Sequence, residues 1–432
     1  MRGSEPVAVG GGFEGLGFFA GFDWAQGKHD VAVVDPGGQV VLQLSFAHDA
    51  EGWAQLREKL AKLGGPVGVA IETSCGPEVE RLLEMGLAVY PMNPKAAERY
   101  RERKAPSGVK NDGLDAYCFA NALRTDGRAW RRLRSQDPAT QLLRILCRDE
   151  IGLIEQRTAL VLQLKAALRE YYPAALEAFE DWTAAFTWDF VVQFPTPQEL
   201  ARAGRRRQQK FLHTHRLYQP ELAEKRLAVF ARANAFASPS PAVTSGKSLL
   251  ATTVAKTLRV LEGQIQEYRR RIAQAFADHP DHGIFASLPR GGQHLAPRLL
   301  AEMGSDRQVF ASAEALHCYS GVAPVTRQSG KWLKVTHMRR ACNKTLRTTL
   351  HLFADVSRQG CVWAEAYYQH KRQEGHSHAH ALRCLGQRWE KILWKMWQDH
   401  KPYDEALHTR NQVKHGSWVV ALTAAPPPAP TR

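Results

Sequence analysis

The sequence has few features of a zinc-finger, secreted or membrane protein. Its seven cysteines are scattered and none forms a C-x-x-C pair, which argues against a zinc knuckle or disulfide framework and suits a reducing compartment. No apolar run is long enough to cross a bilayer. The glycine-rich segment Met1–Gly17 has little positive charge and no signal-peptide core. We therefore expect a cytoplasmic protein without a membrane partner.

The chain also lacks a glycine-rich phosphate loop. The segment Ser245-Gly246-Lys247-Ser248 resembles the end of a P-loop, but Pro241 stands where the upstream glycine is required. We interpret this segment as the start of a helix that is capped by Ser245 or Ser248. ATP is accordingly not expected as a cofactor.

Positive charge is what the chain has in excess. Its 432 residues include 58 Lys and Arg against 43 Asp and Glu, a formal net charge of +15. Such an excess favours a polyanionic partner, because each neutralised phosphate releases counterions. Charge alone leaves nucleic-acid binding and a merely basic protein equally open. The length predicts two or three domains.

Four carboxylates occupy positions where a strand or a helix would hold them in a core. Asp23 interrupts the apolar run near the start of the chain, and Glu72 ends another. Asp112 and Asp115 are three residues apart in a helical pattern, so they share one helix face. Carboxylates are rarely buried without a partner or a metal, and Mg²⁺ (or Mn²⁺) on such ligands bridges phosphate oxygens. The set therefore predicts a nuclease-like metal centre.

The order of the predicted elements supports this interpretation. Three strands are followed by a helix, a strand, a helix, a strand and further helices, which is the order of an α/β RNase H-like (RuvC-like) fold. In that fold the middle of the first strand, the end of the fourth and a late helix meet, and the four acids fall at those places. We interpret the neighbouring acids Asp30, Asp35, Asp49 and Asp126 as turn or surface residues. The predicted strands are 17–23, 30–35, 39–46, 67–72 and 87–92, with helices at 50–63, from residue 77, at 94–104 and around 112–115.

The remaining chain is predicted to be mostly helical. Residues 138–276 contain two long helical patterns, 138–172 and 247–276, which favour an antiparallel arm or a coiled-coil dimer interface. Between them an aromatic and basic insert, about 173–245, is either a small helical subdomain or a nucleic-acid contact. Residues 282–400 form a mainly α carboxyl-terminal domain, and the tail 401–432 is partly disordered.

A serine in this last domain is a candidate nucleophile. Ser329 lies in the predicted loop Val325–Lys331 and would ordinarily be a turn residue. Its neighbours, however, form a cationic field suited to a phosphodiester, which a hydroxyl there could attack. The candidate nucleic-acid-binding residues are Arg327, Lys331, Lys334, Arg339, Arg340, Lys344 and Arg347.

These motifs together resemble the DEDD transposases of bacterial insertion sequences, and more narrowly the insertion-sequence one-ten family. The resemblance covers roughly residues 15–130 and 282–400. One departure is that Pro289-Arg290-Gly291-Gly292 replaces the family's Pro-Gly-x-Gly hairpin. The motifs that carry it are Asp23 at a strand end, Ile71-Glu72, Lys110–Ala116, Tyr319–Pro324, Gln328–Lys331 and Asn343–Arg347.

The resemblance implies a RuvC-like domain, a coiled-coil linker and a transposase domain that recombine donor and target DNA under the direction of a structured bridge RNA. It implies that Asp23, Glu72, Asp112 and Asp115 bind Mg²⁺ (or Mn²⁺). It further implies that Ser329 forms a covalent phosphoserine link to DNA. Sites composed from different protomers imply a dimer or tetramer, which would act on the nucleoid of a bacterial cell.

Three alternatives remain open on the sequence. A plain RuvC-like nuclease would use the same four acids and an activated water, and would leave Ser329 idle. A kinase of the actin-like ATPase superfamily also carries an Asp on its first strand, but Trp24–Lys28 is a poor phosphate loop. An RNA-guided DNA-binding protein with a silent centre would not need all four acids.

Overall fold

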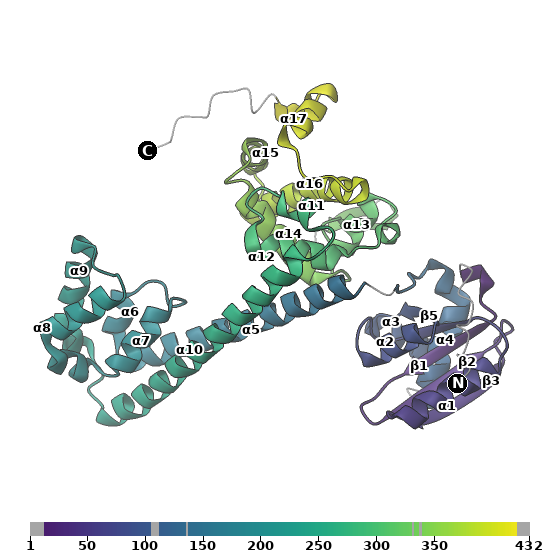
Figure 1. The fold of residues 1–432 in the computed structure, drawn as a ribbon, viewed down its shortest axis with the longest axis horizontal. Coiled ribbons are helices and arrows are strands. Elements are labelled where there is room, and N and C mark those ends of the chain that lie inside the picture. The colour runs from purple at the N-terminus through teal and green to yellow at the C-terminus, as the bar shows by residue number, and fades with distance from the viewer. Residues whose placement is uncertain (1–12, 105–111, 135–136, 331, 337–338, 421–432) are drawn as a thin grey trace. The chain divides into compact units, whose positions relative to one another are not determined.

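The computed structural model describes residues 13–104, 112–134, 137–330, 332–336 and 339–420. The chain forms two compact units, residues 1–135 and 136–432, which are described separately (Figure 1). The finer division into four segments stays a prediction.

The first unit is built on a five-stranded mixed sheet in the order β3-β2-β1-β4-β5. β2 is antiparallel to both β1 and β3, whereas β4 is parallel to β1 and to β5. The sequence prediction of an RNase H-like sheet is confirmed. The strands are β1 (Phe18–Asp23), β2 (Lys28–Val34), β3 (Val40–Ala47), β4 (Val67–Ile71) and β5 (Ala88–Pro91).

Helices cover both faces of this sheet because residues alternate between the faces along each strand. Phe22 packs with Trp53 of α1 and Val79 of α2 on one face. Phe19 packs with Phe119 of α4 on the other face, which α3 also covers. The helices are α1 (Ala50–Ala61), α2 (Pro77–Glu84), α3 (Pro94–Lys104) and α4 (Asp112–Asp126), with single turns η1 (Phe13–Gly15) and η2 (Gly127–Ala129).

Three of the acids interpreted as turn or surface residues have local structural roles. Asp49 caps α1 by accepting a hydrogen bond from the Gly52 N–H at 2.7 Å. Asp35 accepts from the Gln39 N–H in the β2–β3 turn. Asp126, at the end of α4, accepts a hydrogen bond from the Tyr100 hydroxyl. The fourth, Asp30, lies at the candidate site.

In the second unit the two long helices α5 (Pro138–Tyr171) and α10 (Pro241–Ala277) lie side by side (Figure 1). Ion pairs join Glu170 to Lys247, and Glu150 to Arg269. Residues late in α5 thus meet residues early in α10, so the pair is antiparallel, as one of the two interpretations expected. The other interpretation, a dimer interface, stays a prediction.

The start of α10 differs from the sequence prediction. The helix begins at Pro241, and its N-cap is Ser240, which accepts from the Val243 N–H, rather than Ser245 or Ser248. Proline is favoured in the first helical turn because that turn leaves its N–H groups unbonded. The residue that argued against a P-loop therefore marks the true helix start.

The insert between the long helices is a small helical subdomain. Trp188 and Phe190 are fully buried and Trp182 nearly so, within one cluster that also includes residues of α5 and α10. Its aromatic side chains therefore form a core, while Arg205–Arg207 are exposed. The elements are α6 (Pro173–Ala178), α7 (Ala185–Gln193), α8 (Pro197–Thr214), α9 (Pro220–Ala231) and η3 (Ala233–Phe236).

The carboxyl-terminal block is mainly helical and packs around Trp389 and Trp397. The segment predicted as the loop Val325–Lys331 instead contains strand β6, which pairs with β7. The alternation of apolar and polar residues, with a glycine at the turn, specifies this hairpin. Its high content of basic residues is more typical of a loop. The elements are α11 (His282–Ala286), α12 (Gly292–Met303), η4 (Arg307–Val309), α13 (Ala313–Ser320), β6 (Val325–Ser329), β7 (Trp332–Thr336), α14 (Lys344–Ser357), α15 (Val362–Gln373), α16 (His378–Asp399) and α17 (Glu405–Lys414).

Within the described residues, none of the helices combines the length and the apolar character needed to span a bilayer. The tail predicted as partly disordered contains α17, and its residues 421–432 lie outside the described part of the chain.

Candidate active site

The parallel pair β1 and β4 brings two of the predicted acids together. Phe22 of β1 is the register partner of Ile71 of β4, so the next residues, Asp23 and Glu72, lie beside each other at the carboxyl ends of the strands. Asp23 is the last residue of β1 and not in the middle of the strand, as the fold comparison predicted. Both acids are partly buried. The carboxyl edge of adjacent parallel strands is a common place for functional groups in α/β folds.

A glycine on β1 allows α4 to approach the same face of the sheet. A Cβ atom on Gly21 would lie 1.9 Å from the backbone oxygen of Ala116 and 2.6 Å from the Ala120 nitrogen. Only glycine permits this contact. Because Asp23 is two residues beyond Gly21, it lies on the face that α4 covers. Asp115 is next to Ala116, so it lies over the same face of β1 that carries Asp23.

Of the three predicted acids whose burial is described, Asp115 is the most deeply buried, with 2% of its surface exposed. Its Oδ2 accepts a hydrogen bond from Arg101 of α3 at 3.2 Å. Its Oδ1 is buried and has no hydrogen-bond partner among the described residues. A buried carboxylate oxygen without a donor is costly, and a divalent cation would satisfy it. The all-oxygen donor set fits Mg²⁺ or Mn²⁺.

Asp112 is the first residue of α4, one helical turn before Asp115. This spacing puts the two positions on one face of the helix. The side chain of Asp112 lies outside the described part of the structure.

Asp30 was wrongly interpreted as a turn or surface residue. It is the register partner of Asp23 in the antiparallel pair β1–β2, so the two carboxylates are on the same face of the sheet. Lys28 lies 3.9 Å from its Oδ2. The sequence signal that could have identified Asp30 is its position in the hairpin, opposite Asp23 across the short turn.

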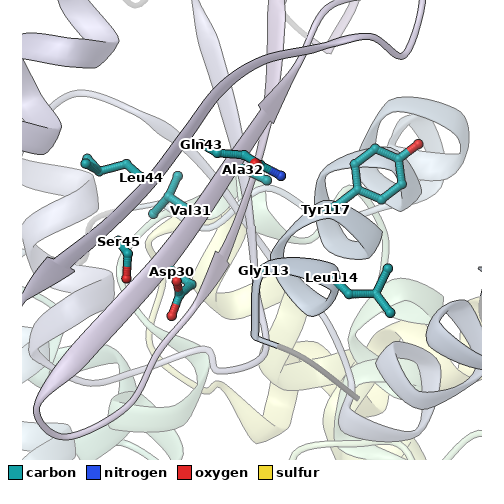
Figure 2. A pocket seen from close by; sticks show the side chains of 9 residues that line it. All are labelled: Asp30, Val31, Ala32, Gln43, Leu44, Ser45, Gly113, Leu114 and Tyr117. Atoms are coloured by element: carbon teal, nitrogen blue, oxygen red, sulfur yellow. The ribbon is translucent and has the colours of Figure 1, made fainter. Parts of the chain in front are cut away.

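Asp30 also lines a cavity of about 510 Å³ between β2, β3 and the start of α4 (Figure 2). Two of its lining residues, Gly113 and Leu114, lie between Asp112 and Asp115 in the chain. Its lining residues are Asp30, Val31, Ala32, Gln43, Leu44, Ser45, Gly113, Leu114 and Tyr117.

The β6–β7 hairpin carries Ser329, Arg327 and Lys334, whereas the predicted cation Lys331 lies outside the described residues. Ser329 is the register partner of Trp332, and Arg327 of Lys334, so positions 327, 329 and 334 share one face. Gly330 follows Ser329 in the turn and has a φ of +56°, in the left-handed region that favours glycine. The side chains at 326–329 and 331–338 are outside the described residues, and this includes Ser329, Arg327, Lys331 and Lys334.

The other predicted cations lie where the hairpin joins α14. Arg340 and Lys344 are exposed. Arg347 instead donates a hydrogen bond to the backbone oxygen of Arg339 at 3.0 Å, and so helps to hold the segment after the hairpin.

Asn343, which the sequence analysis did not select as a site residue, anchors the same junction. Its side chain caps α14 by accepting from the Leu346 N–H at 3.0 Å. Its Nδ2 donates to Glu302 at 2.6 Å and to the Tyr319 hydroxyl at 2.9 Å. Burial disfavours ionised Glu302, but hydrogen bonds from Arg148 and Asn343 hold the pKa of its carboxyl below the ordinary value. A buried charged network thus fixes the segment that follows the hairpin.

Substitution of Asn343 tests this anchoring role. Asn343→Ala is expected to lower the free energy of unfolding by about 1–2 kcal/mol, since the helix loses its cap and Glu302 loses a donor. Urea titration monitored by circular dichroism measures the loss. Ser377→Ala, which removes only the N-cap of α16, is the matched control and should cost less. Equal losses in the two variants would contradict the network role.

A buried acid lies beside the end of α13, the helix that precedes the hairpin in the chain. Ser320, the last residue of α13, donates to Glu390 of α16 at 3.0 Å, and His317 Nε2 is 3.8 Å from the same oxygen. Burial, opposed only in part by the Ser320 hydrogen bond, raises the pKa of Glu390 to about 8. Burial also lowers the pKa of His317. Both groups are therefore mainly uncharged at pH 7.

The raised pKa of Glu390 predicts a pH-dependent stability. Between its ordinary pKa and about 8 the folded state holds a proton that the unfolded state has released, so stability falls as pH rises through this window. Glu390→Gln should flatten this decline in urea midpoints between pH 5 and pH 8. The exposed Glu221→Gln is the control. An unchanged slope in Glu390→Gln would show that this carboxyl is not the cause.

Comparison with known proteins agrees with this architecture. Residues 20–173 match the DEDD transposase model of the IS110 type, and residues 282–369 match the family described as "Transposase IS116/IS110/IS902 family". The first match includes the four acids, and the second includes Ser329 and the seven predicted cations.

Similar whole proteins come from bacterial insertion elements. The mini-circle protein of IS117 from Streptomyces coelicolor is 34% identical over 410 residues, which cover 91% of this chain and 96% of that protein. The 42 kDa protein of IS900 from Mycobacterium paratuberculosis is 28% identical over 407 residues, 90% of this chain and 98% of that protein. With an RNase H-like unit carrying the acids and both family regions in order, the chain belongs to the IS110/IS116/IS902 family of transposases.

Proposed function

We propose that this transposase cuts and rejoins donor and target DNA by attack of Ser329 on a phosphodiester, assisted by a divalent metal at the acid centre. The observation that carries the proposal is the placement of Asp23, Glu72 and Asp115 by β1, β4 and α4, with a buried oxygen of Asp115 lacking a donor among the described residues. A transposase acts on DNA, and a DEDD nuclease domain uses divalent metal.

Asp23, Glu72, Asp112 and Asp115 would hold Mg²⁺ (or Mn²⁺). When bound, the metal supplies positive charge that stabilises the charge developing on phosphate oxygens. Arg101 neutralises one oxygen of Asp115, and the other oxygen, which has no donor among the described residues, would bind the metal.

Ser329 would act as the nucleophile. Its Oγ would form a bond to phosphorus as the bond from phosphorus to one deoxyribose oxygen breaks. The serine proton would pass to water, and the leaving oxygen would take up a proton to become a free hydroxyl. The link between serine and DNA is itself a phosphodiester, so the first step exchanges one phosphodiester bond for another. A deoxyribose hydroxyl can therefore later displace the serine and rejoin the strand without ATP. The backbone register pairs Arg327 with Lys334, and two basic residues at paired positions support an anionic partner.

The protein would assemble as a dimer or tetramer. Large apolar side chains remain exposed on the antiparallel arm, among them Leu162, Leu249 and Val260, each more than 60% exposed. Exposed apolar residues along a long helical pair favour association with another such pair.

A structured bridge RNA would select the two DNA sites. The net charge of +15 and the exposed Arg206 and Arg207 of the insert supply cations beyond those near Ser329, as a second polyanion would require.

The alternative function is a RuvC-like nuclease that hydrolyses DNA with an activated water. It is favoured because all four acids belong to the first unit, so that hydrolysis would need no residue of the second unit. Such an enzyme would cleave DNA without rejoining it and without attachment to the strand.

Reconstitution distinguishes these functions. The purified protein is incubated with donor and target duplexes, Mg²⁺ and RNA transcribed from the DNA flanking its reading frame. Recombinant junctions that appear only with RNA matching both duplexes are the expected result, with a scrambled RNA as control. Junctions formed equally without RNA would overturn guidance, and cleavage without any junction would favour the water-dependent nuclease.

A further inference from the structure

Two histidines and a glutamate converge on the face of the first unit's sheet that α1 and α2 cover. His29 belongs to β2, His48 to the link between β3 and α1, and Glu78 to the first turn of α2. His29 is two residues from Val31 on β2, so both side chains are on the same face of the sheet. On that face Val31 packs with Trp53 and Val79. The cluster is therefore on the opposite face from Asp23 and Asp115, and it is separate from the acid centre.

The ligand atoms of the cluster are close enough to share one ion. His29 Nε2 is 2.7 Å from His48 Nδ1, and His48 Nδ1 is 3.6 Å from Glu78 Oε1. All three atoms lie within 4.8 Å of one another. Bonds of about 2.0–2.1 Å in tetrahedral geometry separate ligand atoms by about 3.3 Å, a value between the two measured distances. Small side-chain movements would thus complete the geometry.

The ligand set is largely buried. His29 and Glu78 are both buried, and the His29 nitrogen that faces the cluster is Nε2. The His29 ring is held 5.1 Å from the rings of Phe22 and Phe46, centroid to centroid, which fixes its orientation as a metal site requires. Burial lowers the pKa of His29, and the neutral imidazole is the form that binds metals.

We propose that His29, His48 and Glu78 bind a divalent cation of the zinc class. Two imidazoles and one carboxylate suit Zn²⁺ better than Mg²⁺, which prefers oxygen ligands. The half-exposed His48 side chain provides a path of entry. The ion would tie β2, the start of α1 and the start of α2 together. It would thereby stabilise the segment between Glu72 and α2. Glu72 is one of the proposed ligands of the acid centre.

Zinc binding by the full-length protein tests the site directly. Protein stripped with a chelator receives Zn²⁺ alone, and affinity is measured by competition with a chromogenic chelator. One tight Zn²⁺ per chain is expected in the wild type. His48→Asn and Glu78→Gln should each weaken binding by at least about tenfold, with folding checked by circular dichroism. Wild-type affinity in both variants, or no tight zinc in the wild-type protein, would overturn the proposal.

Two controls separate this site from other candidates. Asp23→Asn, in the acid centre, and His376→Asn, in the alternating histidines of the carboxyl-terminal block, should both retain the tight zinc. Loss of that zinc in either one would place the ion elsewhere and overturn the assignment.

Cobalt gives a readout that needs no variant. Co²⁺ in the wild-type protein should show the visible absorption of a tetrahedral complex, and one equivalent of Zn²⁺ should remove it. A spectrum of six-coordinate Co²⁺ alone would contradict a site built from these three ligands with tetrahedral geometry.

Discussion

Asp23→Asn is expected to lower DNA strand cleavage and rejoining by roughly 10³-fold or more, since it removes a negatively charged metal ligand from the acid centre. Asparagine has the same shape and keeps the strand end folded. The rate is measured as recombinant junctions formed per protein in the reconstituted reaction, at saturating Mg²⁺. Binding of donor DNA should change far less, because the cations that contact phosphates remain.

The control for this variant is Asp35→Asn in the same sheet. Asp35 accepts a backbone hydrogen bond in the β2–β3 turn, and asparagine preserves that acceptor. Its activity should stay close to that of the wild type. Normal recombination by Asp23→Asn would remove the acid centre from the proposed mechanism.

Ser329→Ala is expected to abolish both strand joining and the covalent link between protein and DNA, because no other atom of the side chain can bond to phosphorus. Ser329→Cys supplies a thiolate in the same position and should retain a measurable fraction of the linkage. Both are read on denaturing gels with labelled donor DNA.

Ser245→Ala is the matched control, since Ser245 is an exposed serine on α10. It should recombine DNA at the wild-type rate. Persistent cleavage by Ser329→Ala with free DNA ends would instead favour water as the nucleophile and contradict the serine mechanism.

Much of the first unit could be predicted from the sequence because its signals are local. Apolar strands bounded by turns, and helices with one apolar face, gave boundaries within a few residues of those observed. The placement of Asp23 beside Glu72 followed from the order of elements, because parallel neighbours bring their carboxyl ends together. The close approach of α4 depends on Gly21, whose role becomes visible only when the register is known.

The features that were missed depend on pairing between distant residues. Asp30 resembles a turn acid until its register with Asp23 is known. Asn343 is an ordinary N-cap in sequence, and its contacts to Glu302 and Tyr319 join three separate elements. The sequence predicts a loop where strand β6 carries Ser329, because glycine and cations outweigh the alternation of a short hairpin.

The sequence does not distinguish the two interpretations of the aromatic insert for a different reason. Exposed rings that stack on bases and buried rings that form a core have the same composition. Only the burial of Trp188 and Phe190 distinguishes them.

The most direct test of the mechanism is the chemical identity of the link between protein and DNA. A donor duplex that is nicked to prevent rejoining would trap the intermediate, and peptide mass spectrometry after digestion would locate the attached nucleotide. The mechanism predicts a phosphoserine bond at Ser329 that forms in wild-type protein and is absent from Asp23→Asn. Attachment at another residue, or efficient strand exchange with no attachment at all, would contradict it.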